Sequence, residues 1–195
     1  MRTHNNLNPW DCISAMQKSI RRGLEVEAMQ FACEMVYASK AMCTWCCNRL
    51  EIVSHEDIDT SSQPHIVPFV HTACTQAKAQ WKKDSYGASR LFVGNAIRIM
   101  CRANKSREGD HFAGAVGLPI ESKTVVPCVP DWAYDSHTIK GKRLQRGVQF
   151  FREVGSQLQP PPTVADPYED TFYAELYKLE ATEFQQELFD GNETA

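Results

Sequence analysis

The sequence lacks any apolar run of the roughly 20 residues that a membrane-spanning helix requires. Its opening residues, Met1 to Asn6, also lack the hydrophobic centre of a secretory signal peptide. These two absences favour a cytoplasmic protein, and we expect it to have no membrane partner.

A phosphate-binding loop of the form Gly-x4-Gly-Lys-Ser/Thr is also missing. The nearest segment, Gly114 to Pro119, lacks the lysine and the following helix that such a loop needs. ATP hydrolysis by this chain alone is therefore not expected. We expect a protein that is not an enzyme and that carries no cofactor.

The eight cysteines lack the spacing of a zinc site or a disulfide framework. Cys43-x-x-Cys46-Cys47 is the only metal-like spacing, and neither a second Cys-x-x-Cys nor a His-x3-5-His pair accompanies it. In a reducing cytosol, such thiols behave as small buried hydrophobes. We expect reduced cysteines in the core and no metal site.

No clear strand-like alternation of apolar and polar residues is present, whereas apolar residues recur at helical spacing. The prediction is an all-α fold, a compact multi-helix domain with an irregular Pro-rich loop and a C-terminal acidic helix. The expected helices cover about 9–22, 24–39, 41–54, a segment from Pro64 or Pro68 to about Lys83, and 86–104.

Glycines and prolines interrupt the pattern after the fifth expected helix. We expect an irregular loop over 117–135, renewed helix from near Ser136 to Phe151, a proline spacer at 160–162 and a last helix over about 168–189. The predicted organisation is a helical domain over 8–116, a loop and basic helix over 117–159, and the spacer with its acidic tail over 160–195.

Short sequence islands in the first 116 residues resemble one known family. The islands are Asp-x-Ile-Ser-Ala-x-x-Lys-Ser-x-Arg from Asp11, Gly-Leu-Glu-Val-Glu-Ala from Gly23, Arg-Leu-Glu-Ile-Val-Ser-His-Glu-Asp-Ile from Arg49, and Ala-Asn-Lys-Ser from Ala103. Together they resemble the C-terminal helical region of RarA/MgsA proteins, clamp-loader-related AAA+ ATPases of replication-coupled recombination.

The resemblance implies a helical collar through which such proteins self-associate. In this chain the collar would occur without the ATPase domain. The resemblance also implies a homo-oligomer and, as partners, a separate AAA+ ATPase or a replication protein. The motif positions that it marks as structural are Asp11, Ser14, Lys18, Ser54, Glu56, Asp57, Lys105 and Ser106.

Two polar clusters could carry chemistry. Ser54-His55-Glu56-Asp57 places two carboxylates beside a histidine. This arrangement suits acid–base catalysis, or it could stabilise the junction between two helices through hydrogen bonds. Asp131, Asp135 and His137 could bind a divalent ion, or could form a turn that caps the following helix. We favour the structural interpretation of both clusters, and a small metal-dependent enzyme remains an alternative.

Charge divides the chain into a mildly basic body and an acidic tail. From Pro161 onward, nine acidic residues stand against one lysine, and no acidic residue occurs between 136 and 152. A basic face there could neutralise DNA phosphates without reading sequence. Its candidate residues are Lys140, Lys142, Arg143, Arg146 and Arg152.

The same basic face could instead be solvated or docked against the acidic tail. The leading hypothesis is a non-catalytic oligomerisation and interaction module that contacts DNA or replication proteins. A further alternative is a structural adaptor that docks on a partner through its acidic tail.

Overall fold

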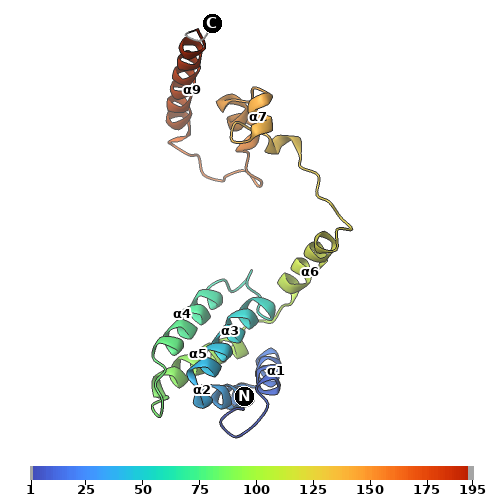
Figure 1. Cartoon of the computed structure of the whole chain (residues 1–195), viewed down its shortest axis with the longest axis vertical. Helices are drawn as coiled ribbons and strands as arrows, with labels where there is room; N and C mark the ends of the chain where they lie inside the picture. The colour runs from blue at the N-terminus through green and yellow to red at the C-terminus, as the bar shows by residue number, and fades with distance from the viewer. Residues whose placement is uncertain (1, 193–195) are drawn as a thin grey trace. The chain divides into compact units, whose positions relative to one another are not determined.

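A computed structural model describes the backbone of residues 2–192 and the side chains of residues 2–182. The chain forms two compact units, Met1–Val125 and Val126–Ala195, and each is described separately (Figure 1). No β-strand occurs between residues 2 and 192, which confirms the all-α prediction. Within the same range, no helix has the length and apolar character needed to cross a membrane.

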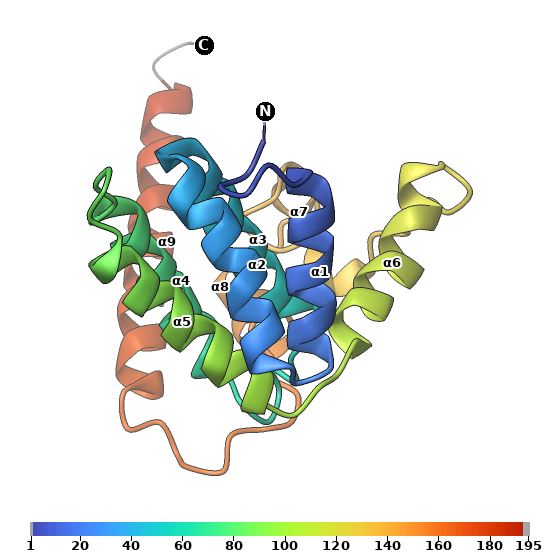
Figure 2. The ribbon, with the colours of Figure 1, turned by 90° about the horizontal axis from the view of Figure 1, so that it is seen from below.

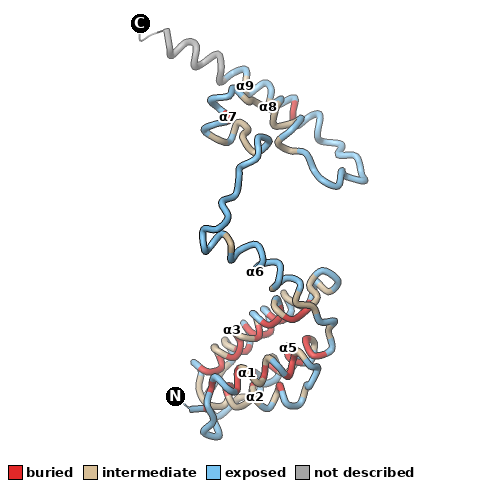
Figure 3. Tube along the Cα trace, turned by 90° about the vertical axis from the view of Figure 1, so that its right-hand side faces the viewer, coloured by how far each residue is buried: buried red, intermediate tan, exposed pale blue. Residues whose placement is uncertain are grey.

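The first unit is built from a bundle of five helices. These are α1 (Pro9–Arg21), α2 (Glu25–Ala38), α3 (Lys40–Glu56), α4 (Ile66–Ala79) and α5 (Gly87–Arg102). The predicted helices over the same segments are confirmed to within a few residues at most ends. Each of these helices contributes buried residues to one hydrophobic cluster, so the core of this unit lies between them, as the buried colour along α3 and α5 illustrates (Figure 3).

Helix α1 shows why these segments fold as the sequence predicts. Asn8 caps the helix by accepting a hydrogen bond from the Trp10 amide at 3.0 Å, and Pro9 occupies the first turn. Gly23 then adopts a φ of +74°, and a Cβ at that position would lie 3.3 Å from the Cys101 carbonyl oxygen. The tight turn at Gly23 lets α2 fold back against α1, beside which it runs in Figure 2.

Cysteines fill much of the core, as predicted. Cys12, Cys43, Cys46, Cys47 and Cys74 are all buried and reduced. Burial raises the pKa of the Cys46 thiol well above its ordinary value, because an ionised sulfur would lose its hydration. These thiols therefore behave as core side chains.

Helix α6 (Glu108–Glu121) closes the first unit and corrects one prediction. The irregular loop expected from residue 117 starts later, because Gly117 and Pro119 both lie inside this helix. The helix ends where the Ser122 amide donates to the Leu118 carbonyl and the Lys123 amide donates to the Ile120 carbonyl. Pro119 lies in the last turn of this helix, where it has no amide hydrogen to donate to the Ala115 carbonyl.

The second unit contains short helices and one long one. They are η1 (Asp131–Ala133), α7 (Ile139–Arg143), α8 (Val148–Phe150), the π-helical turn η2 (Phe151–Gly155) and α9 (Glu169–Asn192). The helix predicted from Ser136 to Phe151 is wrong as a continuous element, because it breaks after Arg143. Gln145 has a φ of +55°, which a right-handed helix cannot accommodate.

Candidate nucleic-acid interface

The predicted structural motif forms a junction at the end of α3. The Asp57 side chain is fully buried, and Arg21 Nε on α1 donates to its Oδ1 at 2.8 Å. Glu56 accepts from Arg21 Nη2 at 3.3 Å, from Arg107 Nη2 at 3.2 Å and from Gln17 Nε2 at 2.9 Å. Two guanidinium groups therefore neutralise the two carboxylates, which supports a structural role for this cluster.

A short backbone pairing brings two of the sequence islands together. Ile58 forms an isolated antiparallel bridge with Lys105, and the Ser106 amide donates to the Asp57 carbonyl at 3.2 Å. Lys105 Nζ donates to the carbonyls of Cys101 and Ala103, both at 3.0 Å, at the C-terminus of α5. Burial lowers the pKa of Lys105, while its bonds to these carbonyls satisfy the ammonium group.

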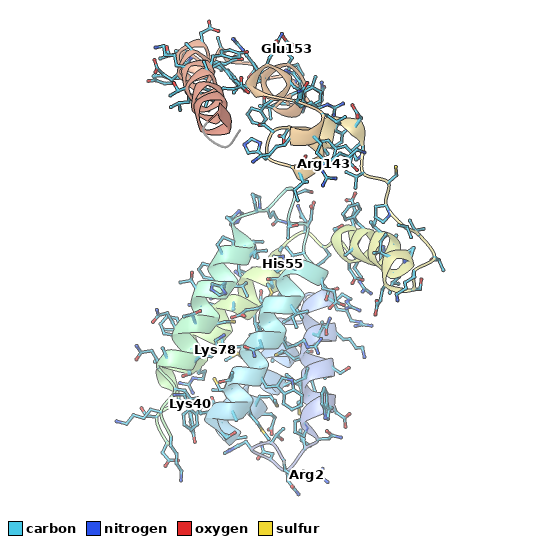
Figure 4. The ribbon with its side chains drawn as sticks, turned by 45° about the horizontal axis from the view of Figure 1, so that its top comes forward. Arg2, Lys40, His55, Lys78, Arg143 and Glu153 are labelled. Atoms are coloured by element: carbon cyan, nitrogen blue, oxygen red, sulfur yellow. The ribbon has the colours of Figure 1, made fainter. Side chains whose placement is uncertain are left out.

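The remaining motif residues lie outside this junction. Lys18 Nζ donates to Ser14 Oγ at 2.7 Å on the exposed side of α1, and Ser54 Oγ donates to the Glu51 carbonyl at 2.7 Å. Asp11 lies in the first turn of α1, where its negative charge interacts favourably with the helix dipole. His55, which is labelled in Figure 4, lies near the C-terminal end of α3 and is exposed.

The second candidate cluster separates in space. His137 Nδ1 lies 3.1 Å from Asp135 Oδ2, and the His137 amide donates to Asp135 Oδ1 at 2.9 Å. The hydrogen bond from His137 lowers the pKa of Asp135. Asp131, in contrast, pairs with Arg146 at 2.7 Å. Among the side chains of residues 2–182, no three histidine, cysteine, aspartate or glutamate groups are placed to hold a metal ion.

Two of the five predicted basic residues are used inside the second unit. Arg146 donates to the carbonyls of Asp131 at 2.8 Å and Tyr134 at 3.1 Å, besides its ion pair with Asp131. Arg152 lies 2.5 Å from Asp170 on α9 and stacks on the Tyr173 ring. The contact of Arg152 with Asp170 is of the kind expected if the basic face docks against the acidic tail.

The other three basic residues project from α7. Lys140, Lys142 and Arg143 are exposed, and none forms an ion pair with a side chain that the structure describes. Lys140 Nζ lies 3.8 Å from the centre of the Tyr134 ring. Arg143 is labelled in Figure 4. Lys140 and Arg143 are three residues apart on α7 and so lie near each other on the helix surface, and we call the three exposed cations the α7 cation cluster.

Two glycines allow the close packing that presents this cluster. A Cβ on Gly141 would lie 1.7 Å from the Asp135 carbonyl oxygen, and one on Gly147 would lie 2.0 Å from Glu180 Oε1. The lack of a Cβ at both positions therefore lets other residues of this unit approach the backbone closely. Thr138 caps α7 by accepting from the Gly141 amide at 3.0 Å, so the cluster is carried by a locally ordered turn.

The structure also contains a groove that sequence reasoning missed. It lies between α2 and α5, has a volume of about 700 Å³, and is lined in part by Val26, Met29, Tyr37, Ile97 and Arg98. Its lining residues come from segments about 60 residues apart in the chain, so no local sequence pattern marks it.

Comparison with models of known protein families gives no match. Comparison with curated proteins also gives no significant match.

Proposed function

We propose that this chain is a non-catalytic interaction module that binds DNA through the α7 cation cluster and self-associates through its helical unit. The observation that carries the DNA-binding half is the exposure of Lys140, Lys142 and Arg143 without a described carboxylate partner. The self-association half follows from the resemblance to the RarA/MgsA C-terminal helical region.

The chemistry of the cluster suits the phosphate backbone of DNA. Three cations on one short element neutralise phosphates regardless of base sequence, and their binding weakens as salt rises. Trp132 is 62% exposed and precedes the cluster in the same unit, so its ring is available to stack on an unpaired base. The expected ligand is therefore DNA bound without strong sequence preference.

The resemblance supplies the proposed protein partners. A separate AAA+ ATPase or another replication protein would provide the motor activity for which this chain has no phosphate loop. In this proposal the chain contributes a scaffold and a DNA contact, and the partner contributes ATP hydrolysis.

Fluorescence anisotropy with labelled single-stranded and double-stranded DNA tests the DNA contact. The double substitution Lys142→Glu with Arg143→Glu should weaken binding and reduce the slope of log K against log salt by about 2, since two phosphate contacts are lost. The matched control is Lys82→Glu with Lys83→Glu, an exposed basic pair of the first unit with the same change in net charge.

The two double variants separate a local contact from a general charge effect. Equal weakening by both would show that net charge governs binding and would overturn the assignment of the α7 cation cluster. The exchange Lys142→Arg with Arg143→Lys keeps both charges, so it should retain most of the affinity.

A further inference from the structure

Helix α6 carries an apolar surface that the first unit leaves uncovered. No charged residue occurs from Phe112 to Ile120, and no residue of the helix is buried. Phe112, Val116 and Ile120 are 68%, 55% and 40% exposed, and their spacing of four places them along one side of the helix. A helix of this apolar character is normally covered by another element.

The contact of α6 with the bundle lies at its N-terminal end. Gly109 approaches the His55 carbonyl, from which a Cβ would lie 3.7 Å away. Beyond that point the trace of α6 is coloured almost entirely as exposed in Figure 3, unlike the five bundle helices. The surface formed by Phe112, Val116 and Ile120, here called the α6 face, is therefore unpartnered within the first unit.

We propose that the α6 face pairs antiparallel with the α6 face of a second copy of this chain. This inference rests on the proposed self-association and specifies its surface. A two-fold axis at Val116 would place Phe112 opposite Ile120 of the second copy, so that each apolar side chain meets another. Ala113 and Gly117, next to the face, would let the two backbones approach closely.

One pair of charges that flanks the face is complementary in this arrangement. Antiparallel pairing centred on Val116 brings Lys123 next to Glu108 of the second copy, and the symmetry repeats this pair. Glu108 is exposed in the first turn of α6, and Lys123 is exposed directly after its last turn. A parallel pairing would instead place like charges together at both ends, so charge favours the antiparallel dimer.

The size of the face sets the expected strength of the pairing. A helix of 14 residues is about 21 Å long. Two such helices bury less than the ~1,200 Å² at which standard stable interfaces begin. The dimer should therefore be weak, and its fraction should rise as the protein concentration is raised.

Sedimentation velocity of the full chain at a series of increasing concentrations tests the proposal. Val116→Asp places two carboxylates on the symmetry axis and should abolish the dimer. Ile52→Asp is the matched control, because Ile52 is a 50% exposed apolar residue on α3, and it should leave the dimer intact. Circular dichroism of both variants checks that the helices remain folded.

A charge exchange tests the antiparallel register independently of the apolar contacts. Lys123→Glu alone and Glu108→Lys alone should each weaken the dimer several-fold, because each creates two like-charge pairs. The double variant should recover the affinity of the original chain. Failure of the double variant to recover it would overturn the antiparallel register.

The outcomes also separate this inference from the proposed function. Association that persists in Val116→Asp would overturn the α6 face while leaving self-association in place. A chain that stays monomeric at every concentration would overturn self-association itself.

Discussion

Arg21 on α1 binds the fully buried carboxylate of Asp57 at the end of α3, with Nε 2.8 Å from Oδ1. Arg107 approaches the same carboxylate oxygen, with its Nε 3.7 Å from Oδ1. The buried charge of Asp57 therefore depends on cations from two separate segments. Removing one cation leaves the carboxylate poorly compensated in a site without water access.

The first prediction concerns Arg21→Met, which keeps the length of the side chain and removes its charge. Loss of one partner of a buried pair costs 3–5 kcal/mol in typical cases. Because Arg107 remains and Arg21 is partly exposed, we expect a loss of about 2 kcal/mol in the free energy of unfolding. Urea denaturation followed by circular dichroism measures it.

Arg22→Met provides the control for this change. Arg22 is exposed and donates to the Lys18 carbonyl at 2.9 Å. Its replacement should alter stability by no more than about 0.5 kcal/mol, as for most surface substitutions. Equal losses in the two variants would contradict the role assigned to the pair of Arg21 and Asp57.

The sequence predicts the helices of this junction better than it predicts the junction itself. Helical spacing and the Asn8 cap are local signals, so the bounds of α1 can be read from neighbouring residues. The partner of Asp57 is 36 residues away in the chain, and no local pattern selects Arg21 over another arginine. Packing of the helices against one another makes that choice.

In the second unit, even the bounds of the helices differ from the prediction. The residues from 136 to 151 carry an apolar spacing that fits a helix, yet Gly141 and Gly147 make contacts that a continuous helix would prevent. Composition marks the basic residues of this unit as a group. Their division between internal contacts and the exposed α7 cation cluster depends on where Asp131 and Asp170 lie, which composition does not give.

The second prediction concerns Gly141→Ala. The added Cβ would lie 1.7 Å from the Asp135 carbonyl oxygen, so the turn that holds α7 must open. We expect faster amide hydrogen exchange across 131–155, with no change in the first unit. Mass spectrometry of peptides from the two units measures both regions in one sample.

Gly87→Ala is the matched control. A Cβ at Gly87 meets nothing within 4 Å at the start of α5. This change should leave exchange unaltered or slow it slightly, because alanine favours helix more than glycine does by up to about 1 kcal/mol. Unchanged exchange in Gly141→Ala would show that the close approach at this glycine is not required.

The third prediction concerns alkaline pH. Burial raises the pKa of Cys101 to about 11, whereas a thiol in an unfolded chain ionises near ~8.5. In this interval the unfolded state releases a proton that the folded state keeps, so stability falls as pH rises. We expect the contribution of Cys101 to be complete below about pH 8.5 and lost as pH passes through about 11.

Urea denaturation at a series of pH values tests this prediction. Cys101→Ala should lower stability at neutral pH and should also make the decline between pH ~8.5 and ~11 less steep. Cys128→Ala serves as the control, because Cys128 is exposed and should leave the pH dependence unaltered. An identical slope in the original chain and Cys101→Ala would show that Cys101 does not titrate in this way.

The fourth prediction compares two contacts between α9 and the rest of the second unit. The pair of Arg152 and Asp170 is short at 2.5 Å, but the Asp170 side chain is 93% exposed, and such pairs contribute about 0–1 kcal/mol. Tyr173 is only 6% exposed, and its hydroxyl lies 2.9 Å from Ser156 Oγ. Burial of this ring should therefore hold α9 more strongly than the ion pair does.

Hydrogen exchange over residues 169–182 distinguishes the two contacts. Tyr173→Ala should release α9 and accelerate exchange along this segment, because a buried aromatic ring contributes about 3–5 kcal/mol to packing. Asp170→Asn should change exchange only slightly, since it removes a charge that is already solvated. If Asp170→Asn released the helix as fully as Tyr173→Ala, the ion pair would be the dominant contact, and the acidic tail would be held by charge.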